Sequence, residues 1–249
     1  MDRFFVDKKN IDLENKVCKI TGDDVKHISK VLRCKTGDEL EICDKENTEY
    51  IGKIFSIDKN EVLLEIIKEV DIKRESNLKV RLYQGLPKST KMEIILQKLT
   101  EIGVDEIVLV QTKRSVAKIE DKKEDKKLER WERIIYEASK QSKRGKIPKL
   151  RGILSFKQAL EDIENNNLNI ACYENEKTNS IKNSIKGVNI DSTGIFIGPE
   201  GGFDEEEIKL MEKNDVKSVS LGNRILRTET ASVVASSIVL YELSDLGGN

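Results

Sequence analysis

The chain has 249 residues, of which 37% are hydrophobic and 36% are charged, which predicts a globular protein with enough apolar material for a core. Its length fits one large domain or two small ones. The net charge of −1 predicts no general affinity for nucleic acid, and no apolar run is long enough for a membrane span or an export signal, so we expect a cytoplasmic protein without a membrane partner.

Potential metal ligands are few and scattered along the chain. No two of the four cysteines, Cys18, Cys34, Cys43 and Cys172, have Cys-x-x-Cys spacing, and His27 is the single histidine. We therefore expect no metal site and four reduced thiols. His27 is expected to serve in packing, in capping or in contact with RNA rather than as an acid–base catalyst.

Residues 1–70 have the pattern of a small β-barrel with one helix. Short apolar runs alternate with Gly, Asp and Asn turn signals, which predicts strands at Val17–Ile20, Leu40–Cys43, Ile51–Ile57 and Val62–Ile67. Between the first two runs, Val25, Ile28 and Leu32 recur at helical spacing. A polar stretch at residues 71–77 is the expected linker to a second domain, residues 78–249.

Residues 78–249 alternate between strand and helix patterns. A capping box is predicted at Thr90–Glu93 and another at Asp204–Glu207, and Gly103 is the expected end of the first helix. The strands are expected at Leu78–Leu86, Asp105–Val110, Leu168–Tyr173, Gly194–Ile197 and Val216–Leu221. Further helices are expected around Leu128–Ala138 and at Phe156–Ile163. A last helix is expected near the C-terminus, with Val234, Ile238 and Tyr241 on the side that faces the core. This alternation predicts an α/β fold with a mostly parallel sheet.

Basic residues gather in three places although the net charge is close to zero. Residues 140–151 read KQSKRGKIPKLR, with no acidic residue. The other two clusters are Lys26, Lys30, Arg33 and Lys35, and Lys113, Arg114 and Lys118. Such patches can neutralise phosphates, whereas a single cluster of this kind is more often a solvated surface.

Two glycine-containing segments follow predicted strands near the C-terminus: GPEGGF at 198–203 and LGNRILRTETA at 221–231. Loops at the carboxyl ends of parallel strands are where α/β sheets bind ligands, and glycine lets the backbone approach a ligand closely. The first segment alone resembles an ordinary turn, because it has neither the Gly-Lys-Ser/Thr of a P-loop nor a dinucleotide fingerprint. In the second, helix capping and the helix dipole account for Thr228 and Glu229 but not for Arg224 and Arg227, which indicate an anionic partner.

Together these segments resemble the motifs of the bacterial 16S rRNA (uracil-N3)-methyltransferase family, in the SPOUT class of knotted methyltransferases. The resemblance extends to Arg3–Phe5, to His27–Arg33, to Lys88–Gly103 and to Arg130–Arg144. It implies a SPOUT-type α/β knot with a deep C-terminal trefoil, an exception to the usual absence of knots. It also implies that residues 1–70 form a PUA-like RNA-binding domain and residues 78–249 a methyltransferase domain that acts as a homodimer.

The resemblance further implies S-adenosylmethionine as the cofactor and 16S rRNA, in the small ribosomal subunit, as the partner. The implied cofactor contacts are Gly198, Glu200, Gly201, Gly202, Leu221, Gly222, Ile225 and Leu226. Arg227, Thr228, Glu229 and Thr230 would line the pocket of the target base. The residues expected to contact RNA are Lys30, Arg33, Lys143, Arg144, Lys146, Thr228 and Thr230.

Methyl transfer to uracil N3 requires loss of the N3 proton, and a cation near the base stabilises the resulting anion. Arg227 is the expected stabiliser, and Glu229 would take the proton or orient Arg227. Two alternatives stay open. One is a knotted RNA methyltransferase with another target atom, a ribose 2′-hydroxyl or guanine, and the other is a non-catalytic RNA-binding assembly factor of the ribosome.

Overall fold

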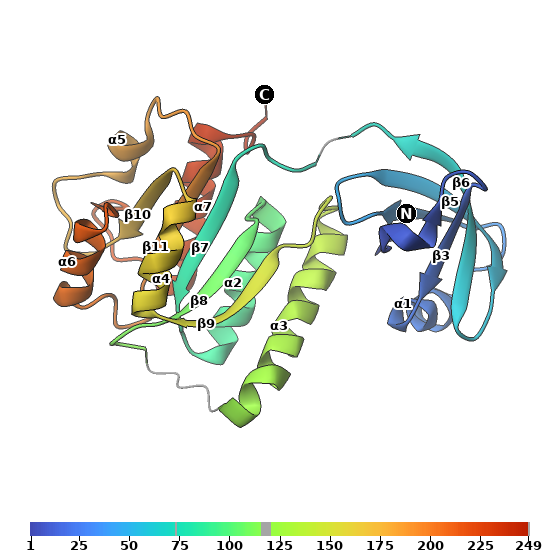
Figure 1. The fold of residues 1–249 in the computed structure, drawn as a ribbon, viewed down its shortest axis with the longest axis horizontal. Coiled ribbons are helices and arrows are strands. Elements are labelled where there is room, and N and C mark those ends of the chain that lie inside the picture. The colour runs from blue at the N-terminus through green and yellow to red at the C-terminus, as the bar shows by residue number, and fades with distance from the viewer. Residues whose placement is uncertain (73, 116–120, 249) are drawn as a thin grey trace. The chain divides into compact units, whose positions relative to one another are not determined.

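A computed structural model describes residues 1–72, 74–115 and 121–248 of the chain. The chain forms two compact units, of which one comprises Met1–Glu75 and Ser139–Ile147 and the other Ser76–Ala138 and Pro148–Asn249 (Figure 1). Lys73 of the expected linker and Lys118 of the third basic cluster lie outside the described residues. Among those described, no helix is long and apolar enough to cross a membrane.

The first unit is built on one curled sheet with the strand order β1-β4-β5-β6-β3-β2. β1 is parallel to β4, and the other neighbouring pairs are antiparallel. The strands are β1 (Arg3–Phe5), β2 (Ile11–Asp12), β3 (Val17–Thr21), β4 (Glu39–Cys43), β5 (Glu49–Ile57) and β6 (Glu61–Val70). The four strands expected from the sequence are confirmed, whereas β1 and β2 were not predicted.

One irregular helical segment covers this sheet. A 3-10 turn at Lys8–Asn10 precedes it, and it consists of α1 (Asp23–Lys26) continued by a π-helical turn at His27–Val31. Val25 and Ile28 are buried in a core that also contains Phe4, and the His27 ring meets Phe4 edge-on, with 6.1 Å between centroids. His27, which is partly buried, therefore packs against this core through Phe4, in line with the expected packing role.

Ser139–Ile147 belongs to the first unit although the sequence pattern placed it in the second. The guanidinium of Arg144 forms three hydrogen bonds with the Glu75 carboxylate, at 2.9, 3.2 and 2.7 Å. The backbone N–H of Gly145 donates to the same carboxylate at 2.7 Å, and its carbonyl accepts from the N–H of Asn47 at 3.0 Å. These contacts join residues about seventy to a hundred positions apart, which no local pattern reports.

The second unit contains a fully parallel sheet with the strand order β12-β10-β11-β7-β8-β9. Its strands are β7 (Lys79–Gly85), β8 (Glu106–Gln111), β9 (Lys149–Ser155), β10 (Leu168–Cys172), β11 (Ser192–Ile197) and β12 (Lys217–Val219). Its helices are α2 (Ser89–Ile102), α3 (Asp121–Gln141, whose last residues enter the first unit), α4 (Phe156–Asp162), α5 (Ile181–Ile185), α6 (Glu205–Lys213) and α7 (Thr228–Leu243), with a 3-10 turn at Ile163–Asn165. The predicted α/β fold is confirmed, and β9 and α5 are additions to it.

Helices cover both faces of this sheet (Figure 1). On one face, α4 and α6 pack over a core in which the rings of Tyr83 and Phe196 stack 4.4 Å apart. α2 and α7 pack against each other, and α7 also contacts β7 and β11. Because neighbouring side chains of a strand point to opposite faces, Gln84 points toward α7 while Tyr83 points away from it.

The predictions of helix ends and of buried helix faces are confirmed in part. The capping box at Asp204 and Glu207 and the left-handed Gly103 at the end of α2 are confirmed. The Thr90–Glu93 capping box is wrong, because α2 begins at Ser89 and its N-cap is Lys88, two residues before Thr90. The predicted core side of α7 is also wrong: Tyr241 is 70% exposed, and the buried residues are Thr228, Ser232, Ala235, Ser236, Val239 and Leu240.

Candidate functional site

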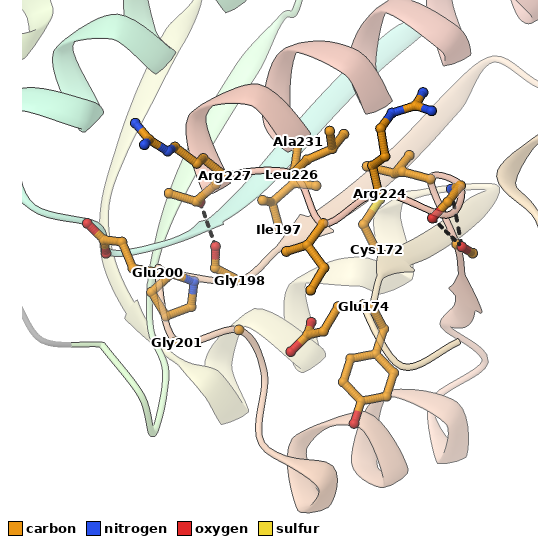
Figure 2. Close-up of a pocket in the computed structure, with 18 of the residues that line it drawn as sticks. Cys172, Glu174, Ile197, Gly198, Glu200, Gly201, Arg224, Leu226, Arg227 and Ala231 are labelled. Atoms are coloured by element: carbon orange, nitrogen blue, oxygen red, sulfur yellow. Dashed lines mark hydrogen bonds between the residues drawn. The ribbon is translucent and has the colours of Figure 1, made fainter. Parts of the chain in front are cut away.

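Three loops at the carboxyl ends of β10, β11 and β12 enclose a pocket of about 390 Å³ (Figure 2). A volume of this size is ordinary for a small-molecule site. Parallel strands bring these three loops to one edge of the sheet, which is where α/β proteins place their ligands. All the expected cofactor residues line this pocket: Gly198, Glu200, Gly201, Gly202, Leu221, Gly222, Ile225 and Leu226.

The loop after β11 is folded back on itself, and Gly198 is required for that fold. A Cβ atom on Gly198 would lie 2.9 Å from the carbonyl carbon of Gly202, closer than real Cβ atoms approach backbone. Gly202 has φ of +67°, a conformation that glycine adopts without strain. The close approach explains the glycine at 198, and the positive φ explains the glycine at 202.

The loop after β12 presents apolar side chains to the pocket. Ile225 is 87% exposed, and Leu226 next to it is partly exposed. Gly222 has φ of +114° and no neighbour within 4 Å of a Cβ position, so its backbone conformation rather than crowding calls for glycine. An isoleucine this exposed at the rim of a pocket offers apolar surface to a ligand.

The third loop, after β10, was missed in the sequence analysis. It contributes Cys172, Tyr173, Glu174 and Lys177 to the pocket lining. Figure 2 shows the Glu174 side chain extending into the pocket, and a Cβ atom on Gly202 would lie within 2.4 Å of its carboxylate. The rule that points to the other two loops, a parallel strand ending in a polar segment, applies equally to Leu168–Tyr173 and could have found it.

The arginines of the second motif are exposed. Arg224 and Arg227 line the pocket and, within the part of the chain that the structure describes, neither has an ion-pair partner. Figure 2 shows the two side chains extending in different directions from the loop. Two unpaired guanidinium groups at one rim leave the pocket open to an anionic ligand, as the sequence indicated.

Glu229 and Thr230 are not among the residues that line the pocket. Glu229 lies in the first turn of α7, and its Oε2 atom is 3.6 Å from Nζ of Lys91 on α2, which does line the pocket. The sequence placed Lys91 in the matched segment Lys88–Gly103 but gave it no role in the site, because its position beside Glu229 depends on the packing of α2 against α7. Thr230 is exposed.

Thr228 lines the pocket but is largely buried. It is only 6% exposed, and its hydroxyl donates to the carbonyl oxygen of Gly198 at 2.6 Å. The hydroxyl therefore joins the two motif loops, and contact of Thr228 with the base or the RNA stays a prediction.

The expected RNA contacts in the first unit fall into two groups. Lys30, Arg33 and Lys146 are exposed, and Lys143 is partly exposed with its ammonium 2.7 Å from Glu41. Arg144 is 4% exposed and bound to Glu75, so its guanidinium is not available to a phosphate and this expectation is corrected.

Burial and polarity set the chemistry of the remaining groups. The four cysteines are free thiols, as expected, and burial raises the pKa of Cys18 to about 12. Within the described ranges, no group of His, Cys, Asp and Glu side chains could hold a metal ion. The groups that the pocket presents to a ligand are backbone atoms, apolar side chains, carboxylates and cations.

Comparison with protein families identifies the two parts of the chain. A family described as RNA methyltransferase domain matches residues 74–240, and one described as RNA methyltransferase PUA domain matches residues 20–67. The chain is 36% identical to ribosomal RNA small subunit methyltransferase E of Bacillus subtilis, over the full length of both proteins. The chain belongs to this methyltransferase family. The family resemblance of its two C-terminal motifs is confirmed.

Other relatives and solved structures agree with this assignment. Ribosomal RNA small subunit methyltransferase E of Mesomycoplasma hyopneumoniae is 36% identical over 94% of this chain and 96% of its own. The enzyme of the same name from Neisseria gonorrhoeae, solved with bound S-adenosylmethionine, has a TM-score of 0.87 and 26% identity, covering 98% of this chain and 99% of its own. A Legionella pneumophila methyltransferase, also solved with this cofactor, has a TM-score of 0.88 and 30% identity, covering 98% of each chain.

Proposed function

We propose that this protein transfers a methyl group from S-adenosylmethionine to N3 of one uridine of 16S rRNA, in the assembled small ribosomal subunit. The observation that carries the proposal is the pocket between the two motif loops, in a chain 36% identical over its full length to a ribosomal RNA small subunit methyltransferase. A substrate in the ribosome supports a cytoplasmic location for the protein.

The residues of the pocket fit the proposed cofactor. Gly198, Gly201, Gly202 and Gly222 line the pocket without side chains, so both motif loops offer backbone groups to the ligand. Ile225 and Leu226 supply apolar surface for a purine ring, and the Glu174 carboxylate complements hydroxyl or ammonium groups. Bound S-adenosylmethionine supplies an electrophilic methyl group on a sulfonium centre. Gly198, Glu200, Gly201, Gly202, Leu221, Gly222, Ile225 and Leu226 would hold it.

The chain itself would bind and orient the base and move its proton. Uracil N3 carries a proton that must leave before or during attack, and Glu229 is the carboxylate proposed to receive or hold it. Arg227 is proposed to stabilise the negative charge that develops on the base. Thr228, which lines the pocket, and Thr230, exposed in the first turn of α7, are the other motif residues proposed to contact RNA.

The parts of the chain are proposed to divide the work. Residues 1–70 would be a PUA-like RNA-binding β-barrel, residues 71–77 a linker and residues 78–249 a SPOUT methyltransferase domain. The PUA match at residues 20–67 supports RNA contacts by Lys30 and Arg33. Lys143 and Lys146 lie in Ser139–Ile147, which belongs to the same compact unit, and are proposed to contact RNA as well. These side chains would grip phosphates around the target.

A deep C-terminal trefoil knot and a homodimer are proposed for the methyltransferase domain. β12 is an edge strand, yet the chain after it returns through α7 to β7 in the sheet interior, which supports a knotted path. Val234 and Ile238 are partly exposed and Tyr241 is 70% exposed, so α7 has an apolar face outside the core. That face supports a dimer interface near the last helix.

The proposed function is tested with purified protein, labelled S-adenosylmethionine and small ribosomal subunits from a strain that lacks the gene. Mass spectrometry of the digested rRNA is expected to detect 3-methyluridine at one position and to show that naked rRNA is a poorer substrate. A ribose-methylated nucleoside or a methylguanosine would assign another target atom. No methyl transfer, with intact RNA binding, would favour an assembly factor.

A further inference from the structure

Lys91 lies between the carboxylates of the two motif loops. Its Nζ atom is 3.3 Å from Oε1 of Glu200, in the loop after β11, and 3.6 Å from Oε2 of Glu229, in the first turn of α7. The three side chains are 27%, 22% and 17% exposed, so each is largely shielded from water. One cation thus links the loop proposed to bind the cofactor with the helix proposed to act on the base.

Glu200 is held in place from several directions. Burial opposes its charged form, but its own backbone N–H, the N–H of Lys88 and the Lys91 ammonium outweigh that effect, so the pKa of the Glu200 carboxyl is lowered. The Lys88 N–H donates to Oε1 at 3.2 Å, and Lys88 is the N-cap of the helix that carries Lys91. Glu200 therefore binds the first turn of α2 at two points, the Lys88 N–H and the Lys91 ammonium, and so restrains the Lys91 side chain.

Glu229 has an unused acceptor atom. Its Oε2 is buried and, among the described residues, has no hydrogen-bond partner, because 3.6 Å to Lys91 is too long for a hydrogen bond. Buried carboxylate oxygens are rarely left without a donor, since an unmade hydrogen bond to a charged group is costly. Lys91 compensates the charge of this oxygen, which is too buried for a ligand to reach, so contact of Glu229 with a base falls to its other oxygen, Oε1.

We propose that Lys91 is a positioning residue, which holds Glu229 through Oε2 so that the other carboxylate oxygen, Oε1, accepts the hydrogen bond of the target base's N3–H. The inference rests on the proposed function, because uracil N3 supplies the N–H donor for Oε1. Lys91 acts through Glu229, and Glu200 is the anchor that keeps Lys91 in place.

The test is single-turnover methylation of small ribosomal subunits at saturating cofactor and saturating substrate, with Lys91→Met and Lys91→Arg variants. Displacing a reacting group by about 1 Å can cost roughly a hundredfold in rate, so Lys91→Met is expected to slow the chemical step by about tenfold to a hundredfold. Dissociation constants for cofactor and RNA are expected to change by less than about twofold, because the lost interaction orients rather than binds. Lys91→Arg is expected to recover most of the rate.

Lys98→Met is the matched control. Lys98 lies on the same helix and pairs with Glu101 at 2.8 Å, away from the pocket lining. This variant is expected to keep the wild-type rate, and thermal unfolding of all variants shows whether each is folded. A Lys91→Met protein that is folded and methylates at the wild-type rate would overturn the inference.

A double-mutant cycle with Glu229→Gln separates positioning from a direct role. If Lys91 acts through Glu229, the double variant is expected to be no slower than Glu229→Gln alone, because residues that act as a unit are not additive. The inference would be contradicted if the rate loss of the double variant equalled the product of the two single losses. It would also be contradicted if Lys91→Met lost rate only through weaker binding of the cofactor or the RNA. The wild-type protein's production of 3-methyluridine tests the proposed function separately, so the two failures can be told apart.

Discussion

The hydroxyl of Thr228 donates a 2.6 Å hydrogen bond to the backbone carbonyl of Gly198, thirty residues away in the chain. The same hydroxyl accepts from Nε2 of Gln84 at 3.0 Å, and the hydroxyl of Ser232 donates to Oε1 of Gln84 at 2.6 Å. Gln84 and Ser232 are completely buried. This network joins β7, the loop after β11 and the first turn of α7 beneath the pocket, so both motif loops have one common support.

Thr228→Val is expected to destabilise the second unit and weaken the pocket. Valine has nearly the same shape but cannot accept from Gln84, and leaving a buried polar group unpaired costs about 1–3 kcal/mol. Denaturant unfolding would measure the loss, and calorimetry would show weaker S-adenosylmethionine binding. Thr230→Val, at an exposed position of the same turn, is the control; equal effects of the two would contradict the role of the network.

Gly198→Ala is expected to abolish cofactor binding by steric conflict within the loop after β11. The added methyl group would lie 2.9 Å from a backbone atom of Gly202, and backbone cannot move aside as a flexible side chain can. Gly152→Ala is the matched control, because a Cβ there has no neighbour within 4 Å. Isothermal calorimetry checks both variants, and tight binding by Gly198→Ala would show that the loop is adaptable.

Arg227→Ala is expected to slow methyl transfer at saturating RNA and cofactor by roughly a hundredfold to a thousandfold, the usual cost of losing an electrostatic stabiliser. Arg224→Ala, which removes a similarly exposed arginine of the same loop, is expected to affect binding more than the chemical step. Single-turnover kinetics separates these outcomes. If Arg227→Ala only raises the RNA concentration required, Arg227 is a phosphate contact.

The two basic neighbours Arg144 and Lys146 are expected to respond in opposite ways. Arg144→Ala leaves Glu75 buried without its cation, which is expected to lower the free energy of unfolding by about 3–5 kcal/mol. Lys146→Ala is expected to leave stability unchanged and weaken RNA binding, with a salt dependence shallower by roughly 0.7–0.9 for the lost phosphate contact. Denaturant unfolding and RNA titrations at several salt concentrations measure the two effects. Unchanged RNA affinity in Lys146→Ala would make the patch an ordinary solvated surface.

The loop after β10 is expected to lose stabilisation in acid through Glu176. The hydroxyl of Thr178, then the N–H groups of Asn179 and Thr178, bind this carboxylate and lower its pKa from 4.5 to about 2. Because the folded pKa is the lower one, this stabilisation is complete above about pH 4.5 and disappears as the pH falls toward about 2. Thermal unfolding of wild type and Glu176→Gln is expected to differ by a small, constant amount above pH 4.5, and by less below it. A difference that grows in acid would contradict this assignment.

The amino-acid sequence by itself determined the features that depend on neighbouring residues. Alternating strand and helix patterns indicated the α/β fold, and the Asp204–Glu207 capping box follows from residues three positions apart. The two C-terminal motifs indicated the family because their residue types recur as contiguous strings. The same strings named every glycine of the pocket, since a loop after a buried strand is recognisable locally.

Only the tertiary structure decided which side chains face one another. Apolar periodicity selected Val234, Ile238 and Tyr241 for the core, but close packing of α7 buries small residues such as Ser232 and Ser236 instead. Lys91 reaches Glu200 and Glu229 only because α2 and α7 pack together. The sequence around Arg144 predicts a surface cation, whereas the folded chain places Glu75, a distant residue, against it. Such pairings depend on contacts between distant segments, whose formation no local pattern encodes, and they give the Arg144 side chain a structural role and the Thr228 hydroxyl a partner in the loop after β11.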